Sequence, residues 1–254
     1  MQLYLATAPQ HLAQALDHTA HIAHMAYRMG PDGQLHIQSL PAGVQGGLML
    51  LGDTPESALS QPELLAGQIL QVCLRRNFAG VVLDLQQSYS QLPAFARQLG
   101  TRLSRHGRRL YVPESCAGAG TVLICTAISG GTLAQRLSEA AARYGAGRIA
   151  LDLQRLAMDF LLPAPQGEGT PLSLSRLRQL MTGRPVYFSN ELGARYFTYV
   201  QGGRTHFVLF DDAATLIQKI RLAEDLGIRQ GFVMLPETED LLSQLPWEKK
   251  EAEP

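Results

Sequence analysis

The 254-residue sequence is poor in charged residues, in cysteine and in tryptophan. Charged residues make up 17% of the chain, and 22 basic side chains balance 22 acidic ones. Nucleic-acid-binding proteins usually carry a basic excess on one face, so this balance argues against a nucleic-acid partner. No apolar run approaches the ~20 residues that cross a bilayer, and we expect no membrane span.

The three cysteines, Cys73, Cys116 and Cys125, indicate neither a zinc site nor a disulfide framework, because they lack CxxC spacing and any pairing leaves one over. His18, His21 and His24 lie three residues apart, but no carboxylate or cysteine completes a ligand set. We therefore expect no metal and no cofactor. The amino terminus lacks the basic start and apolar run of a secretory signal. A cytoplasmic protein is expected, or a secreted or spore-associated one if a leader has been removed.

Short apolar runs of strand length alternate with longer helical patterns along the whole chain. This alternation is typical of βαβ units and a mostly parallel sheet. About 250 residues is the usual length of one eight-stranded α/β barrel. No linker divides the chain, so we predict a single (β/α)8 TIM barrel over residues 1–245 and a charged, disordered tail over residues 246–254. An open doubly wound sheet is the alternative, although no glycine-rich nucleotide-binding motif follows a strand.

The barrel strands are predicted from short, buried-looking apolar runs. They are Leu3–Thr7, Ile22–Met29, Gly47–Leu51, Gly80–Leu85, Arg109–Pro113, Ile149–Leu153, Pro185–Phe188 and Gly231–Leu235. Thr121–Thr126 is also strand-like, and we interpret it as an extra hairpin rung rather than a barrel strand. Two further runs flank a turn that contains Gly202 and Gly203, which predicts a β-hairpin insertion near residues 195–210.

Acidic residues lie at or just after the ends of several predicted strands, at the end of the barrel where functional groups lie. They are Asp53, Asp84, Glu114, Asp152, Glu191 and Glu237. Together they would form an electronegative cup, or else several of them cap helices or lie in loops.

The sequence Leu-Asp-Leu-Gln occurs twice, at residues 83–86 and 151–154. Period-two alternation places Asp84 and Gln86 on one face of their strand, and Asp152 and Gln154 on one face of theirs. These polar pairs are expected to point into the barrel. They would form either a hydrogen-bonded layer or a ligand site.

Phe78–Gln86 has the sequence FAGVVLDLQ, which is similar to the motif F-D-G-[VIL]-D-[IL]-D-W-E. This motif lies on the fourth strand of the family 18 glycoside hydrolases, which the chain therefore resembles. ARYFTY from Ala194 and FDDA from Phe210 resemble the bacterial branch associated with spore cortex and peptidoglycan. The resemblance implies a chitinase-like barrel that binds carbohydrate.

In that family the last Glu of the motif is the general acid. The Asp two residues earlier orients the substrate acetamide, whose oxygen attacks the anomeric carbon. Asp84 matches this Asp, whereas Gln86 stands at the acid position. A carboxamide has no proton to donate near neutral pH, and losing a general acid costs about 10²–10⁴ in rate. The sixth-strand motif M-x-Y-D is matched to residues 151–154 and the last-strand Trp to Leu235, so further groups are missing.

Three hypotheses follow. The first is a pseudoenzyme that binds a glycan of N-acetylglucosamine type without hydrolysing it, with Tyr187 or Tyr196 as stacking faces. The second is an active glycosidase with a displaced acid, Glu114 or Asp152. The third is a structural barrel whose mouth a partner protein covers. The candidate ligand-binding residues are Asp84, Gln86, Glu114, Asp152, Gln154, Tyr187, Glu191 and Leu235.

Overall fold

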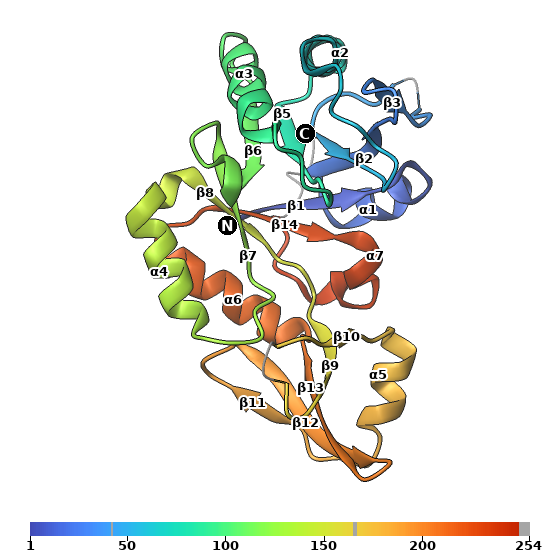
Figure 1. The fold of residues 1–254 in the computed structure, drawn as a ribbon, viewed down its shortest axis with the longest axis vertical. Helices are drawn as coiled ribbons and strands as arrows, with labels where there is room; N and C mark the ends of the chain where they lie inside the picture. The colour runs from blue at the N-terminus through green and yellow to red at the C-terminus, as the bar shows by residue number, and fades with distance from the viewer. Residues whose placement is uncertain (42, 165–166, 249–254) are drawn as a thin grey trace, which may run out of the picture.

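The computed structural model describes residues 1–41, 43–164 and 167–248. Its main feature is a closed barrel of parallel strands (Figure 1). The strands, in chain order, are β1 (Gln2–Thr7), β2 (Ile22–Met29), β4 (Leu48–Gly52), β5 (Gly80–Leu83), β6 (Arg109–Pro113), β7 (Thr121–Cys125), β8 (Ile149–Asp152) and β14 (Gln230–Met234). Each pairs with the next, and β1 pairs with both β2 and β14, which closes the ring. The predicted (β/α)8 barrel is confirmed.

Helices cover the outside of the barrel. They are α1 (Leu12–His18), α2 (Pro62–Arg75), α3 (Leu92–Ser104), α4 (Leu133–Tyr144) and α6 (Ala213–Asp225). In α2 the side chains of Leu65, Ile69 and Cys73 recur every four residues and are fully buried, as an amphipathic helix against a sheet requires. A separate apolar cluster fills the inside of the barrel and includes Tyr4, Tyr111 and Phe232. The strands are therefore buried on both faces, which explains their continuous apolar runs.

Short elements complete the barrel. They are η1 (Pro9–His11), β3 (Leu35–Ile37), η2 (Glu114–Cys116), η3 (Ala146–Arg148), α7 (Leu235–Thr238) and η4 (Glu239–Gln244). Strand β3 pairs antiparallel with the end of β2, across a turn over residues 31–34. The predicted tail falls mostly on residues 249–254, which lie outside the described residues.

An antiparallel sheet is inserted between β8 and α6 and forms the lower lobe in Figure 1. Its strands, in spatial order, are β10 (Thr170–Pro171), β9 (Ala157–Leu161), β13 (Arg204–Phe210), β12 (Ala194–Gln201) and β11 (Tyr187–Ser189). Helix α5 (Leu174–Met181) packs its Leu177 and Leu180 with Phe197 of the sheet. The predicted hairpin is confirmed as β12 and β13, and it is part of a larger subdomain that includes β9, which the sequence reading missed.

Two strand predictions were wrong. The segment Thr121–Thr126 is not an extra rung, because β7 pairs in parallel with β6 and β8 and is the sixth barrel strand. Pro185–Phe188 is not the seventh barrel strand, because β11 pairs antiparallel with β12 in the inserted sheet. Strand β8, predicted to be the sixth, is consequently the seventh. Strand β5 ends at Leu83, so Asp84 follows the strand rather than lying within it.

Candidate functional site

A cavity of about 300 Å³ opens at the carboxyl-terminal end of the barrel. We call it the mouth cavity. Its apolar wall consists of Leu50, Val82, Leu123, Phe232 and Met234, and its polar wall of Asp84, Gln86, Cys125, Asp152, Gln154 and Glu237. Ligand pockets in proteins begin at about this volume and combine an apolar lining with a few polar groups.

The loop after β5 supplies Asp84 and Gln86 to the mouth cavity. Gln86 is exposed there, and its Nε2 donates a hydrogen bond to Oδ1 of Asp84 at 2.9 Å. Asp53, at the end of β4, fixes this loop. Its carboxylate accepts hydrogen bonds from the backbone N–H groups of Gln86 and Gln87 at 2.9 and 3.0 Å, and from the Tyr89 hydroxyl at 2.8 Å. Asp53 therefore positions the motif from outside the cavity.

Strands β7 and β8 supply Cys125, Asp152 and Gln154. The Cys125 thiol donates to Oε1 of Gln154 at 3.4 Å, which joins the ends of the two strands. The Asp152 carboxyl group is half-buried and accepts no hydrogen bond from any described residue. The pairs Asp84/Gln86 and Asp152/Gln154 thus meet in one cavity, although Asp84, Gln86 and Gln154 follow their strands and do not lie on a strand face as predicted.

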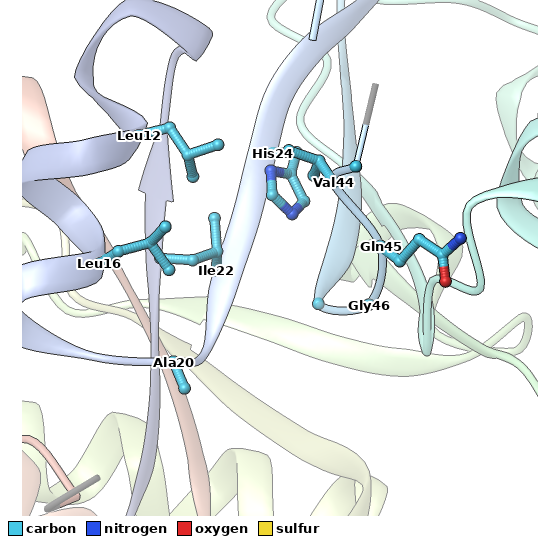
Figure 2. A pocket seen from close by; sticks show the side chains of 10 residues that line it. Leu12, Leu16, Ala20, Ile22, His24, Val44, Gln45 and Gly46 are labelled. Atoms are coloured by element: carbon cyan, nitrogen blue, oxygen red, sulfur yellow. The ribbon is translucent and has the colours of Figure 1, made fainter. Parts of the chain in front are cut away.

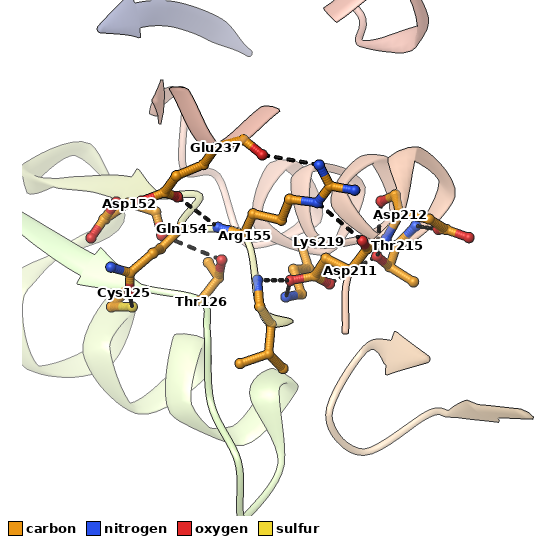
Figure 3. Close-up of polar contacts among 11 residues, drawn as sticks. Cys125, Thr126, Asp152, Gln154, Arg155, Asp211, Asp212, Thr215, Lys219 and Glu237 are labelled. Atoms are coloured by element: carbon orange, nitrogen blue, oxygen red, sulfur yellow. Dashed lines mark hydrogen bonds and ion pairs between the residues drawn. The ribbon is translucent and has the colours of Figure 1, made fainter. Parts of the chain in front are cut away.

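Glu237 enters the mouth cavity from α7 and is held by Arg155, which follows β8. The backbone N–H of Arg155 donates to Oε2 of Glu237 at 3.1 Å, and its guanidinium donates to the Glu237 carbonyl oxygen at 3.0 Å. The same guanidinium pairs with Asp240 at 2.5 Å. Figure 3 shows Arg155 between Glu237 and Asp211. The Nε of Arg155 donates a hydrogen bond to the carbonyl oxygen of Asp211 at 3.4 Å.

Asp211 lies beyond Arg155 in a fully buried polar cluster that joins the inserted sheet to the barrel. Lys219 of α6 and Thr215 each donate to its carboxylate at 2.8 Å, and the backbone N–H of Leu156 donates at 3.0 Å (Figure 3). Asp211 and Lys219 are 0% and 1% exposed. Because every charge here has a partner, this cluster is structural.

The carboxyl groups of the mouth cavity all have raised pKa values. Burial raises the pKa of Asp152 to about 6, and the charges of Asp84 and Glu237 add to the effect. Burial also raises the pKa of Asp84, an effect that the Gln86 amide partly offsets. The pKa of Glu237 is raised by burial against the opposing hydrogen bond from Arg155. Several perturbed carboxyl groups in one cleft are typical of a functional site.

Four predicted site residues lie away from the mouth cavity. Glu114 forms a surface ion pair with Arg136 at 2.6 Å. Glu191 accepts from the Ser189 hydroxyl in the β11–β12 turn. Tyr187 lies on the inserted sheet, where its ring centroid is 5.5 Å from that of Tyr196. Leu235 is 2% exposed and packs in the core under the helices.

Leu235 was matched to the family's last-strand Trp and included among the ligand-binding candidates, but strand alternation points Phe232 and Met234 into the cavity instead. Leu123 and Cys125 were also missed as site residues, because β7 was not recognised as a barrel strand. The same alternation would have found all four once the strand order was correct. Glu237 was recognised only as an acidic residue after a strand.

A second cavity, of about 260 Å³, lies outside the barrel wall, between α1 and the loop before β4 and beside the start of β2 (Figure 2). Leu12, Leu16 and Ile22 line one side of it, and the segment over residues 43–47 lines the other. His24 is 4% exposed there, and burial lowers its pKa to about 4, so it is neutral at pH 7. This apolar cavity offers no set of convergent polar groups, and the mouth cavity is the better functional candidate.

Within residues 1–41, 43–164 and 167–248, no group of three or more His, Cys, Asp or Glu side chains could hold a metal ion. No helix in the same ranges is long and apolar enough to cross a membrane.

Comparison with known proteins adds the fold family. The sequence matches no family model and no curated protein. Its structure is similar to a chitinase from Chromobacterium violaceum, with a TM-score of 0.71 and 14% identity over 95% of this chain and 96% of that one. The chain has a chitinase-like barrel fold. The spore cortex-lytic enzyme SleL of Bacillus megaterium is also similar, with a TM-score of 0.68 and 17% identity over 98% of this chain and 75% of that one.

A third similar structure is human YKL-39, which is described as a pseudo-chitinase with retained chitooligosaccharide binding. It has a TM-score of 0.63 and 10% identity, over 97% of this chain and 96% of that one. Identities of this size establish the shared barrel alone, so ligand and activity must be argued from the mouth cavity.

The observed strand order changes which strand of this chain corresponds to the family's sixth-strand motif. Since β7 is the sixth barrel strand, the family's sixth-strand motif M-x-Y-D corresponds to the end of β7 rather than to residues 151–154. There the inward-facing positions are Leu123 and Cys125, followed by Thr126. Tyr and Asp are absent from this position too, so the resemblance still implies the loss of both groups.

Proposed function

We propose that the mouth cavity binds a glycan of N-acetylglucosamine type, such as peptidoglycan or chitin fragments, without hydrolysing it. The observation that carries this proposal is the position of Gln86. It stands at the motif's acid position, open to the cavity, with its amide hydrogen-bonded to Asp84. The side chain can bind a sugar hydroxyl through its free donor and acceptor positions, but it has no proton to give to a leaving group.

Other features of the cavity support sugar binding. Gln86, Gln154 and Asp84 provide amide and carboxylate groups that pair with hydroxyl groups. Phe232 in the apolar wall stacks on Tyr4, with centroids 5.3 Å apart, which fixes the position of its ring. A fixed apolar wall beside polar groups is the usual composition of a small-molecule site.

The test combines calorimetry with an activity assay. We expect the wild-type protein to bind an N-acetylglucosamine tetramer and to show no turnover of a chromogenic N-acetylglucosaminide. Asp84→Asn should weaken binding by about tenfold, because it removes a charge-assisted hydrogen bond. Glu114→Gln is the matched control, since it removes a carboxylate outside the cavity.

A second candidate function is glycoside hydrolysis with Asp152 as a displaced acid. Its pKa of about 6 favours this idea, because such a group is partly protonated near neutral pH. Glu114 has no part in it, because it lies outside the cavity in an ion pair. Turnover that disappears in both Asp84→Ala and Asp152→Asn would support hydrolysis and contradict the first proposal. Failure to bind any glycan would favour a mouth covered by a partner protein.

A further inference from the structure

The ionisable carboxyl groups that line the mouth cavity have no described basic side chain among them to balance their negative charge. Asp84, Asp152 and Glu237 reach it from three different parts of the barrel, and no described lysine, arginine or histidine lines it. The cavity itself, with its apolar wall and two amides, defines the binding space. The carboxyl groups define the sign of charge that a ligand must bring.

The basic side chains beside the cavity form ion pairs with carboxylates outside it, although the charge of Arg155 also acts on Glu237. The Arg155 guanidinium pairs with Asp240, which also pairs with Arg178 at 3.0 Å. Lys219 is buried against Asp211. Arg136 pairs with Glu114 on the surface. None of these cations neutralises the Asp152 carboxyl group, which is half-buried and receives no hydrogen bond from a described residue.

A bound sugar would displace water from these carboxyl groups and so remove their present solvation. A neutral acetamide offers one N–H donor and no charge in return. An ammonium group on the same sugar carbon offers three N–H donors and a full positive charge, and hydrogen bonds between ionised groups are about twice as strong as neutral ones. Burying a charge without a partner is costly, so the cavity favours the cationic form of the ligand.

We propose that the mouth cavity selects an amino sugar with a free, cationic amino group, and therefore prefers a glucosamine unit to an N-acetylglucosamine unit. This inference rests on the proposed glycan-binding function and narrows its ligand to de-N-acetylated glycan. The ammonium group pairs with Asp152 and Glu237, and the Gln86 and Gln154 amides remain available for sugar hydroxyls.

The experiment compares two tetramers of equal length by calorimetry at pH 7. One is built from glucosamine and the other from N-acetylglucosamine. We expect the glucosamine tetramer to bind at least about tenfold more tightly, which is the contribution of one charge-assisted hydrogen bond. Raising the salt from about 50 mM to about 500 mM should weaken this binding more than that of the acetylated tetramer.

Three variants locate the effect. Asp152→Asn and Glu237→Gln should each weaken the glucosamine tetramer by about tenfold and leave the acetylated tetramer nearly unchanged. Glu114→Gln removes the same charge from outside the cavity and should change neither. If Glu114→Gln weakened binding as much as Asp152→Asn, the preference would be a general surface attraction and the inference would be wrong.

The remaining outcomes separate this inference from the proposed function. Equal or tighter binding of the acetylated tetramer overturns the preference for a free amine and leaves glycan binding intact. If neither tetramer binds, the proposed function fails and the inference fails with it.

Discussion

Asp211 and Asp152 lie on either side of Arg155 and show two ways in which this fold treats a carboxyl group. Asp211 is fully buried and accepts hydrogen bonds from Lys219, Thr215 and the Leu156 backbone. Asp152 faces a cavity and two other acidic groups, and no described residue donates to it. A satisfied charge holds the structure together, whereas an unsatisfied charge at a cavity is available to a ligand.

Removing the partner of Asp211 should have the largest effect on stability. We expect Lys219→Met to lower the free energy of unfolding by about 3–5 kcal/mol, because it leaves a buried carboxylate without its cation. Urea unfolding at pH 7 measures this loss. The double variant Asp211→Asn/Lys219→Met should recover much of it. If Lys219→Met lowered the free energy of unfolding by less than about 1 kcal/mol, Asp211 would not depend on its partner, and its contrast with Asp152 would be wrong.

Replacing Asp152 should have the opposite effect and raise the free energy of unfolding. Its pKa of about 6 in the folded protein lies above the ordinary value of 3.8 for Asp, so its contribution to stability is present below about pH 4 and lost as the pH rises through 6. Asp84, Glu237 and Cys125 are the titratable groups that face it. We therefore expect Asp152→Asn to raise the free energy of unfolding by roughly 1–3 kcal/mol at pH 8 and by little at pH 4.

Unfolding curves of wild type and Asp152→Asn at the two pH values provide the measurement. A gain in stability that accompanies weaker ligand binding is typical of a functional site. Destabilisation at pH 8 would mean that Asp152 has a structural partner, and would contradict the contrast with Asp211.

Arg155 connects the two regions, and its replacement should have an intermediate effect. Arg155→Gln removes the ion pair with Asp240 and the hydrogen bond to the Glu237 carbonyl oxygen, but keeps the backbone N–H that holds the Glu237 carboxylate. We expect a loss of about 1 kcal/mol in urea unfolding, because Asp240 retains Arg178. Glycan affinity should change little. A loss of affinity equal to that of Glu237→Gln would show that the guanidinium also acts on the cavity.

The smallest effect is expected at Glu114. Its pair with Arg136 is exposed to solvent, with side-chain exposures of 39% and 38%. Such pairs contribute about 0–1 kcal/mol, so Glu114→Gln should leave both the urea midpoint and glycan affinity almost unchanged. A marked fall in glycan affinity would mean that Glu114 is part of the binding site.

Much of the barrel could be predicted from the sequence because its strands are continuous apolar runs between helical patterns. Asp84, Gln86, Asp152 and Gln154 line one cavity, although only Asp152 lies within a strand and the other three follow their strands. Eight barrel strands were predicted and eight are present, but Pro185–Phe188 was taken for one of them in place of Thr121–Thr126.

The error at residues 121–126 has a physical cause. Only residues 114–120 connect β6 to β7, which is too short for the helix that usually joins parallel strands. The chain returns through η2 and reaches β7 at Gly120, where a Cβ atom would lie 2.2 Å from the Leu110 carbonyl oxygen. Such close backbone approach requires glycine, and a lone glycine in a sequence does not reveal it.

The composition of the site was harder to predict than the fold. Glu114 and Glu191 follow predicted strands just as Asp84 does, and their sequence positions do not distinguish a cavity from a surface ion pair. Only tertiary structure shows that Arg136 reaches Glu114 and that Arg155 turns Glu237 toward the cavity.

The most direct test of the central claim, that glycan occupies the mouth cavity, is the rate at which Cys125 reacts with a maleimide. Cys125 lines this cavity, whereas Cys73 and Cys116 are buried in the core, so mass spectrometry can follow its labelling alone. Burial and the charge of Asp152 raise the pKa of the Cys125 thiol, so the reaction without ligand will be slow. A saturating amino-sugar tetramer should slow it further by about tenfold or more, since bound ligand excludes the reagent. An unchanged rate under conditions where calorimetry shows binding would place the glycan elsewhere and contradict the account.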